Sequence, residues 1–213
     1  MKILVTGFQP FGDETKNPSY EAVKLLPDKI LGAEIIKKEI PVVFRKGGQL
    51  VQQLVRQLQP DAVILVGQSG GRTAVCVERI AINCQECSRL SADNEGNSPL
   101  GEKIYEDGPD GLFSTLPIKA MVQKMLDNDV PAYVSNTAGT YVCNDLMYHL
   151  LYLLRNEFPD IRGGFIHVPY ATMQNHPRTA SMPLKEIARG LELSIEAVIE
   201  NQQDIVRGDG VSQ

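Results

Sequence analysis

Short apolar runs alternate with segments of helical periodicity along most of this chain. A run of roughly four to eight apolar residues between turn residues predicts a buried strand, and apolar residues recurring every three or four positions predict a helix. The predicted strands are residues 2–6, 34–40, 61–66, 75–83, 132–135 and 163–168. The predicted helices are residues 19–26, with Ser19 as the N-cap, 48–58, 118–126, 143–158 and 184–202.

Strands that alternate with helices predict a mostly parallel β-sheet with helices on both faces. Because the chain contains no repeat, low-complexity tract or linker, residues 1–213 are expected to form a single α/β domain. Residues 84–115 are rich in Asp, Asn, Gly and Pro, and they predict a long excursion from the sheet, of a kind that is often functional. The last few residues are expected to be frayed.

Composition narrows the class of protein. Of the 213 residues, 43% are hydrophobic and 22% are charged, as in ordinary globular domains. The net charge of −5 argues against a nucleic-acid-binding protein. No apolar run approaches the roughly 20 residues that span a bilayer, and the N-terminal apolar run is too short for a secretory signal peptide. We therefore expect a cytoplasmic protein, with no membrane or nucleic-acid partner, whose four cysteines are thiols.

The candidate catalytic and binding residues lie where the predicted strands end. In open α/β sheets, ligands bind beyond the carboxyl ends of the strands. The residues at those ends are Phe8 and Phe11, then Gln68, then the segment 136–143, then His167. A thiol, an imidazole and aromatic walls are therefore expected at one edge of the sheet.

Cys143 is the candidate nucleophile. It follows a turn of small residues and begins a predicted helix, where backbone N–H groups and the helix dipole favour the thiolate. On position alone, a buried structural cysteine is an equally good interpretation. A thiolate nucleophile needs a base and proton donor within reach. His167 is the histidine that closes a strand at this edge. His149 is expected on a different face of the Cys143 helix, and His176 in a solvated loop.

Glu78 is the candidate third member of a catalytic triad. Period-two alternation places it on the same side of its strand as Cys76, and a carboxylate on an apolar face is costly unless it is paired. Such an acid would orient the imidazole and stabilise its cation. A surface pair with Arg79, or an ion pair with no catalytic role, explains the same pattern.

Two other motifs carry less information. The glycine loop at residues 67–71 lacks the spacing of both dinucleotide-binding and phosphate-binding loops. Cys84 and Cys87 have C-x-x-C spacing, but no second pair completes a zinc site and no evident helix follows, as one would in a thioredoxin-like motif.

Four blocks of the sequence together resemble the type I pyroglutamyl peptidases, also called pyrrolidone-carboxylate peptidases, a family of cysteine peptidases. The blocks are TGFQPFG at 6–12 with NPS at 17–19, VGQSGGR at 66–72 with ERIAIN at 78–83, SNTAGTYVCN at 135–144, and GGFIHVPY at 163–170. The sequence DNEGN at 93–97 is also similar to the family. One departure is Cys76, where the family usually carries Ser or Thr.

The resemblance implies a three-layer α/β/α sandwich, commonly a homotetramer, that removes N-terminal pyroglutamyl residues from peptides without a metal or cofactor. It implies Cys143 as the nucleophile, His167 as general base and acid, and Glu78 as the acid that orients His167. The reaction then passes through a thioacyl enzyme. The residues implied to surround the substrate ring are Phe8, Phe11, Asn17, Gln68 and Tyr141.

Two alternatives remain open at this point. One is a different cysteine amidohydrolase on the same scaffold, which a panel of arylamide substrates would reveal. The other is a non-catalytic ligand-binding α/β domain that uses the glycine loop at 67–71, which would need no reactive thiol at Cys143.

Overall fold

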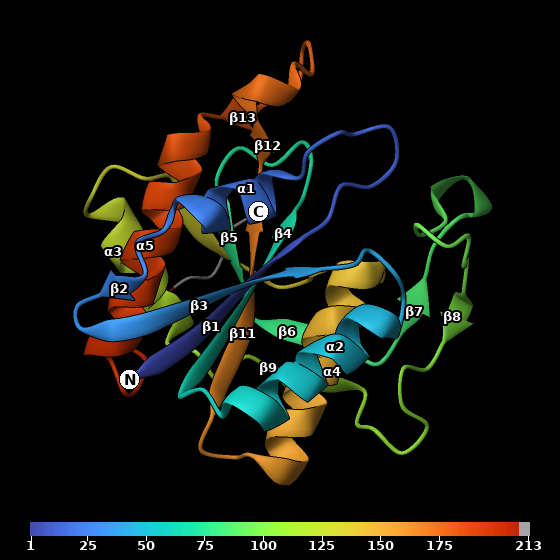
Figure 1. Ribbon diagram of the computed structural model, residues 1–213, viewed down its shortest axis with the longest axis horizontal. Helices are drawn as coiled ribbons and strands as arrows, with labels where there is room; N and C mark the ends of the chain where they lie inside the picture. Colours follow the sequence, from blue (N-terminus) through green and yellow to red (C-terminus); the bar gives the residue numbers. More distant parts are fainter. Residues whose placement is uncertain (209–213) are drawn as a thin grey trace.

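A seven-stranded β-sheet runs through the centre of the protein in the computed structural model (Figure 1). Its strand order is β10-β5-β11-β4-β1-β3-β2. The strands are β1 (Lys2–Phe8), β2 (Lys29–Ile30), β3 (Ala33–Ile40), β4 (Ala62–Gln68), β5 (Val75–Glu78), β10 (Ala132–Ser135) and β11 (Arg162–Val168). The structure describes residues 1–208, so the expected fraying at residues 209–213 lies outside the described residues.

Five helices cover the two faces of this sheet (Figure 1). One face is covered by α1 (Pro18–Leu25), α3 (Ile118–Leu126) and α5 (Leu184–Glu200), and the other by α2 (Lys46–Leu58) and α4 (Val142–Glu157). Each face has its own apolar cluster, because the strands are buried on both sides. This arrangement is the expected three-layer α/β/α sandwich.

The sheet is mostly parallel, as predicted, but its strands do not all run the same way. β1, β3, β4 and β11 are parallel to one another, whereas β5 pairs antiparallel with β11. β10 is parallel to β5, so β5 and β10 both run opposite to β11. The short edge strand β2 is antiparallel to β3.

The predicted strand 75–83 is wrong as a single element. The structure breaks it at Arg79 into β5 and β6 (Ile80–Ile82). β5 belongs to the central sheet, whereas β6 pairs antiparallel with β9 (Gly111–Phe113). The break arises because the chain changes pairing partners there: the Arg79 N–H donates to the Ser135 carbonyl, and the Ser114 N–H donates to the Arg79 carbonyl.

The predicted N-cap of α1 is also wrong. Asn17, not Ser19, caps the helix: its side chain accepts a hydrogen bond from the Ser19 N–H at 3.1 Å. Pro18 occupies the first turn, where a missing N–H costs nothing. Asn17 therefore combines a capping role with its position near the expected site.

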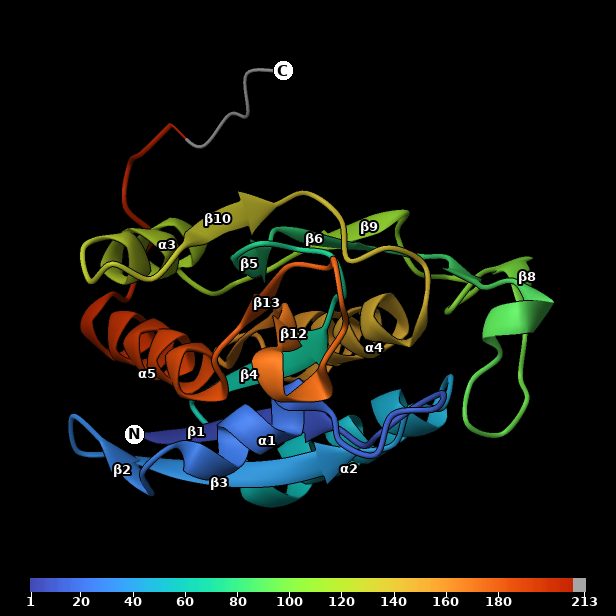
Figure 2. The same cartoon turned by 90° about the horizontal axis from the view of Figure 1, so that it is seen from above.

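The expected excursion at residues 84–115 lies outside the central sheet and projects to one side (Figure 2). It contains β7 (Gln85–Glu86), a 3₁₀ turn at Arg89–Ser91, β8 (Leu100–Glu102) and β9. The Asp93 carboxylate accepts hydrogen bonds from the backbone N–H of Phe44, outside this segment, and from those of Glu95 and Asn97 within it. Among the described residues, no helix combines the length and apolar character needed to cross a membrane.

Candidate active site

Glu78 and His167 lie on neighbouring antiparallel strands. In the register of β5 and β11, Phe165 faces Glu78 and His167 faces Cys76, so Glu78 is diagonal to His167 on one face of the sheet. The His167 Nδ1 atom is 2.7 Å from Glu78 Oε1, and both side chains are buried. A surface pair between Glu78 and Arg79 is wrong, because the Arg79 Nε donates to Asn136 Oδ1 instead.

Arg72 is a charged partner of Glu78 that the sequence reasoning did not identify. Its Nη1 atom lies 3.0 Å from Glu78 Oε1, the oxygen that also meets His167. The Arg72 Nε donates to Ser69 Oγ at 3.0 Å, and its Nη2 donates to the Thr137 carbonyl at 3.2 Å. Arg72 thereby joins the loop after β4 to the loop after β10. The available signal was an arginine six residues before a carboxylate on an apolar strand.

Cys143 lies in the first turn of α4 and contacts the middle of the sheet. A Cβ atom at Gly67 would lie 3.0 Å from Cys143 Sγ and 2.7 Å from Phe165 Cζ, so only glycine permits this approach. Gly67 on β4 is the register partner of His167 on β11. The Cys143 thiol is therefore held over the strand beside His167.

For Cys143, the convergence does not arise as the strand-end rule suggested. β10, which precedes Cys143, runs opposite to β11, so their carboxyl ends point in opposite directions. The segment that follows β10 still reaches the end of β11, because β5 and β10 stop level with Phe165, halfway along β11. The segment after Ser135 then carries the start of α4 to Gly67. The expected edge is therefore confirmed for Phe8, Gln68 and His167, which lie at or next to the carboxyl ends of β1, β4 and β11. Cys143 reaches this edge through the segment after Ser135, and not because β10 ends there.

Burial shifts the pKa values of both Cys143 and His167. Burial, with a smaller contribution from the Glu78 carboxylate, raises the pKa of the Cys143 thiol to about 12. Burial lowers the pKa of His167, although Glu78 acts in the opposite direction. Burial of the thiol thus opposes the thiolate that the helix-start position favours, and burial of His167 favours the neutral imidazole.

The start of α4 supplies backbone donors beside this thiol. Helix geometry leaves the first N–H groups without intrahelical partners, and the Asp145 N–H, which donates to the Tyr141 carbonyl, is the first to find one. The N-cap residue Tyr141 makes no side-chain capping bond. These N–H groups are therefore placed to bind a developing oxyanion next to Cys143 Sγ.

A cavity of about 30 Å³ opens beside Cys143, and all five residues expected around a substrate ring line it. Its lining residues are Phe8, Phe11, Asn17, Val42, Gln68, Tyr141, Val142 and Cys143. The walls are mostly apolar, and two carboxamides are the polar groups besides the tyrosine hydroxyl. Val42 and Val142 were not anticipated, because an aliphatic side chain beside a strand or helix end has no distinctive sequence signal.

Two histidines and two cysteines lie outside this cluster, namely His149, His176, Cys84 and Cys87. Cys76, in contrast, lies opposite His167 on the same face of the sheet. His149 is buried in the α4 packing, with Nδ1 2.8 Å from the Tyr105 hydroxyl. His176 lies in a loop and is one-third exposed, as expected of a solvated residue, but its Nε2 atom is also 2.6 Å from Glu14 Oε1 and its ring packs on Tyr170. All four cysteines are free thiols, as expected.

Comparison with known proteins identifies close relatives. The family model for pyroglutamyl peptidase matches residues 1–201. A pyrrolidone-carboxylate peptidase of Clostridium perfringens is 54% identical over 207 residues, covering 96% of both chains, and one of Streptococcus pneumoniae is 53% identical over 202 residues, covering 94% of both. The crystal structure of Bacillus amyloliquefaciens pyroglutamyl peptidase I has a TM-score of 0.91 at 42% identity, covering 96% of this chain and 99% of that one. The pyrrolidone carboxyl peptidase of Thermococcus litoralis also has a TM-score of 0.91, at 32% identity, covering 97% and 99%.

Proposed function

Because this chain belongs to the pyroglutamyl peptidase family, we propose that it is a cysteine exopeptidase that hydrolyses the N-terminal pyroglutamyl residue from peptides. The observation that carries the proposal is the cluster at the β5–β11 junction. Glu78 Oε1 lies 2.7 Å from His167 Nδ1 there. The Cys143 thiol lies over Gly67, the register partner of His167, beside a mostly apolar cavity. A non-catalytic binding domain would need no such arrangement.

Each residue of the proposed triad, Cys143, His167 and Glu78, has a separate role in the reaction. Since Nδ1 of His167 faces Glu78, Nε2 is the nitrogen left to exchange protons with the reactants. His167 takes the thiol proton as Cys143 Sγ attacks the pyroglutamyl carbonyl carbon, which removes the need for a preformed thiolate. Glu78 stabilises the resulting imidazolium, and Arg72 holds the Glu78 carboxylate in place.

The tetrahedral intermediate then collapses to a thioacyl enzyme. Its oxyanion accepts hydrogen bonds from backbone N–H groups at the start of α4. The C–N bond breaks as His167 gives its proton to the leaving amine, and the shortened peptide departs. His167 next accepts a proton from the water that attacks the thioester carbon. It returns this proton to Cys143 Sγ as the C–S bond breaks and pyroglutamate leaves.

The cavity suits a neutral ring. Pyroglutamate is a lactam without an ammonium group, so it needs apolar walls and a few hydrogen-bonding partners. Phe8, Phe11 and Tyr141 supply the walls, and Asn17 and Gln68 supply the partners. A volume of about 30 Å³ holds one or two water molecules, so ring binding requires a wall to move outward. Phe11 is the best candidate, because it is half-buried and lies on the loop between β1 and α1.

The direct test is hydrolysis of pyroglutamyl, prolyl and glutaminyl arylamides by the purified protein. We expect the pyroglutamyl substrate to exceed the glutaminyl one by several orders of magnitude in kcat/KM, because the open residue brings an ammonium into an apolar cavity. A higher rate on a non-lactam substrate would support a different cysteine amidohydrolase. Binding of the lactam without hydrolysis would support a non-catalytic domain.

We also propose a cytoplasmic homotetramer. The cytoplasmic assignment is supported by four free cysteines, which a reducing compartment maintains. The tetramer is supported by the family resemblance. Light scattering coupled to size-exclusion chromatography should give four times the chain mass, and a monomeric mass at micromolar concentration would contradict the tetramer.

A further inference from the structure

We propose that Gln174 is a positioning residue for the pyroglutamyl ring, because it turns the Gln68 side chain so that an N–H donor faces the cavity. The inference rests on the proposed function and adds a specificity-determining residue to it. Gln174 ends the 3₁₀ turn Thr172–Gln174, which follows β12 (Tyr170–Ala171). It does not line the cavity and acts through Gln68, which does.

The backbone N–H of Ala171 determines which end of the Gln174 carboxamide faces Gln68. The Ala171 N–H can only donate, and it does so to Gln174 Oε1 at 2.9 Å. This bond directs the other end of the Gln174 carboxamide, Nε2, towards Gln68, where it donates to Oε1 at 2.9 Å. The Gln68 Nε2 atom therefore points away from Gln174, and among residues 1–208 it has no hydrogen-bond partner. Its two hydrogens are available to a ligand in the cavity.

The second carboxamide of the cavity is oriented by the same kind of relay. The Phe8 N–H donates to Ser19 Oγ at 2.9 Å, so the Ser19 hydroxyl hydrogen is directed to Asn17 Oδ1 at 2.7 Å. Asn17 Nδ2 is left as the donor end, with one hydrogen on the Gln9 carbonyl at 3.0 Å. Both carboxamides thus present N–H groups, which together select a ligand with a hydrogen-bond acceptor on the ring. A lactam carbonyl is such an acceptor, and a prolyl ring lacks it.

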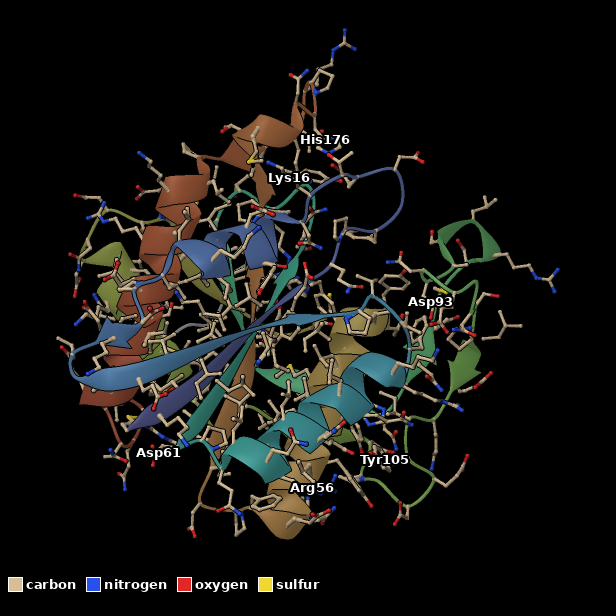
Figure 3. All side chains as sticks on the ribbon, in the orientation of Figure 1. Lys16, Arg56, Asp61, Asp93, Tyr105 and His176 are labelled. Carbon is tan, nitrogen blue, oxygen red and sulfur yellow. The ribbon has the colours of Figure 1, made fainter. Side chains whose placement is uncertain are left out.

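The turn that carries Gln174 is held from both sides. The Tyr170 ring packs directly over Gly70, where a Cβ atom would collide with it. Tyr170 also packs on His176, which is labelled in Figure 3, with ring centroids 3.9 Å apart. His176 Nε2 lies 2.6 Å from Glu14 Oε1. Glu14 is on the loop that carries Phe11. These contacts fix the position of the Gln174 carboxamide relative to the cavity.

The test compares Gln174→Glu with the wild-type protein. A carboxylate still accepts the Ala171 N–H but cannot donate to Gln68 Oε1, so the Gln68 carboxamide reverses and points its oxygen at the ring carbonyl. We expect KM for a pyroglutamyl arylamide and Ki for 2-pyrrolidone to rise together by roughly tenfold or more, with kcat within about threefold. Gln174→Met, which removes the donor without adding charge, should raise both constants by a smaller factor. Gln53→Glu, on the exposed side of α2, is the control for added charge and should change neither constant.

The outcomes separate this inference from the proposed function. If the wild-type protein neither hydrolyses the pyroglutamyl substrate nor binds 2-pyrrolidone, the proposed function fails. If the wild-type protein does both, but KM and Ki of Gln174→Glu and Gln174→Met stay within twofold of wild type, the positioning role is overturned. A fall in kcat at constant KM would also overturn it, because it would place Gln174 in the chemical step. Should Gln174→Glu fail to fold, as judged by circular dichroism, the Gln174→Met constants decide.

Discussion

The Arg72 guanidinium and the His167 imidazole share one oxygen of Glu78. Arg72 Nη1 is 3.0 Å and His167 Nδ1 is 2.7 Å from Glu78 Oε1, and the carboxylate is fully buried. A buried carboxylate is costly unless it is paired, so the positive charge of Arg72 offsets part of the cost of burying Glu78. The same positive charge lowers the pKa values of both His167 and Cys143.

Replacing Arg72 should therefore change the pH dependence as well as the rate. In the wild-type protein we expect kcat/KM to fall only below about pH 6.5, because burial lowers the pKa of His167. We expect kcat/KM to stay level across the neutral range, because burial raises the pKa of Cys143 to about 12. Arg72→Met removes a charge that lowers the His167 pKa, so the acid limb should move to higher pH, with kcat/KM reduced roughly tenfold. Arg56→Met, which breaks an exposed ion pair with Glu157, is the control. An unchanged acid limb would show that Arg72 does not act on His167.

Cys143→Ala and Cys143→Ser should lose activity by roughly 10⁴-fold or more while keeping the wild-type melting temperature within a few degrees. The reason is that the thiol supplies the nucleophile, whereas its replacement removes little packing. Cys84→Ala should retain wild-type kinetics. Iodoacetamide inactivation should track alkylation of Cys143, measured by peptide mapping, and 2-pyrrolidone should slow it. An active Cys143→Ala protein would refute the assignment.

His167→Ala should be nearly as severe as loss of the thiol, since thiol deprotonation and leaving-group protonation share that imidazole. Glu78→Gln should cost less, roughly 10- to 100-fold in kcat, because an amide oxygen still accepts from Nδ1 but no longer stabilises the imidazolium by charge. Steady-state kinetics on the pyroglutamyl arylamide measure both variants. Wild-type kinetics in Glu78→Gln would reduce Glu78 to a structural residue.

Asp145 gives a prediction about stability. Burial raises its pKa from 3.8 to about 7 in the folded protein, although the Arg45 N–H donates to its Oδ2. A pKa raised on folding contributes stability below about pH 4 that is lost as the pH rises through 7. Among the described residues, its Oδ1 and the His149 Nε2, 3.6 Å apart, have no hydrogen-bond partners.

Asp145→Asn should therefore stabilise the protein at pH 8 by about 2 kcal/mol, because the buried amide carries no charge at any pH. Urea unfolding at pH 5 and pH 8 measures the difference, which should be much smaller at pH 5. Asp160→Asn, at an exposed position, is the matched control. A destabilised Asp145→Asn variant at pH 8 would show that the carboxylate is ionised and needed.

Local patterns in the sequence determined most of the elements and the candidate residues. Apolar spacing placed α3 at Ile118–Leu126 and β10 at Ala132–Ser135 with the bounds that the structure has. Alternation placed Glu78 on an apolar face, and it is fully buried. These features were predictable because side-chain periodicity and the cost of an unpaired charge depend on neighbouring positions in the chain. The residues around the cavity came instead from the family resemblance.

Only the tertiary structure decided strand direction, partners and proton positions. The reversal of β5 and β10 and the break at Arg79 depend on which distant strands compete for the same backbone groups. The roles inferred for Arg72 and Gln174 arise from contacts with Glu78 and Gln68 that folding creates. Desolvation raises the pKa of Cys143 and so opposes the helix-start position, which favours a thiolate. This effect is not readable from the local sequence, because burial is a property of the packed fold.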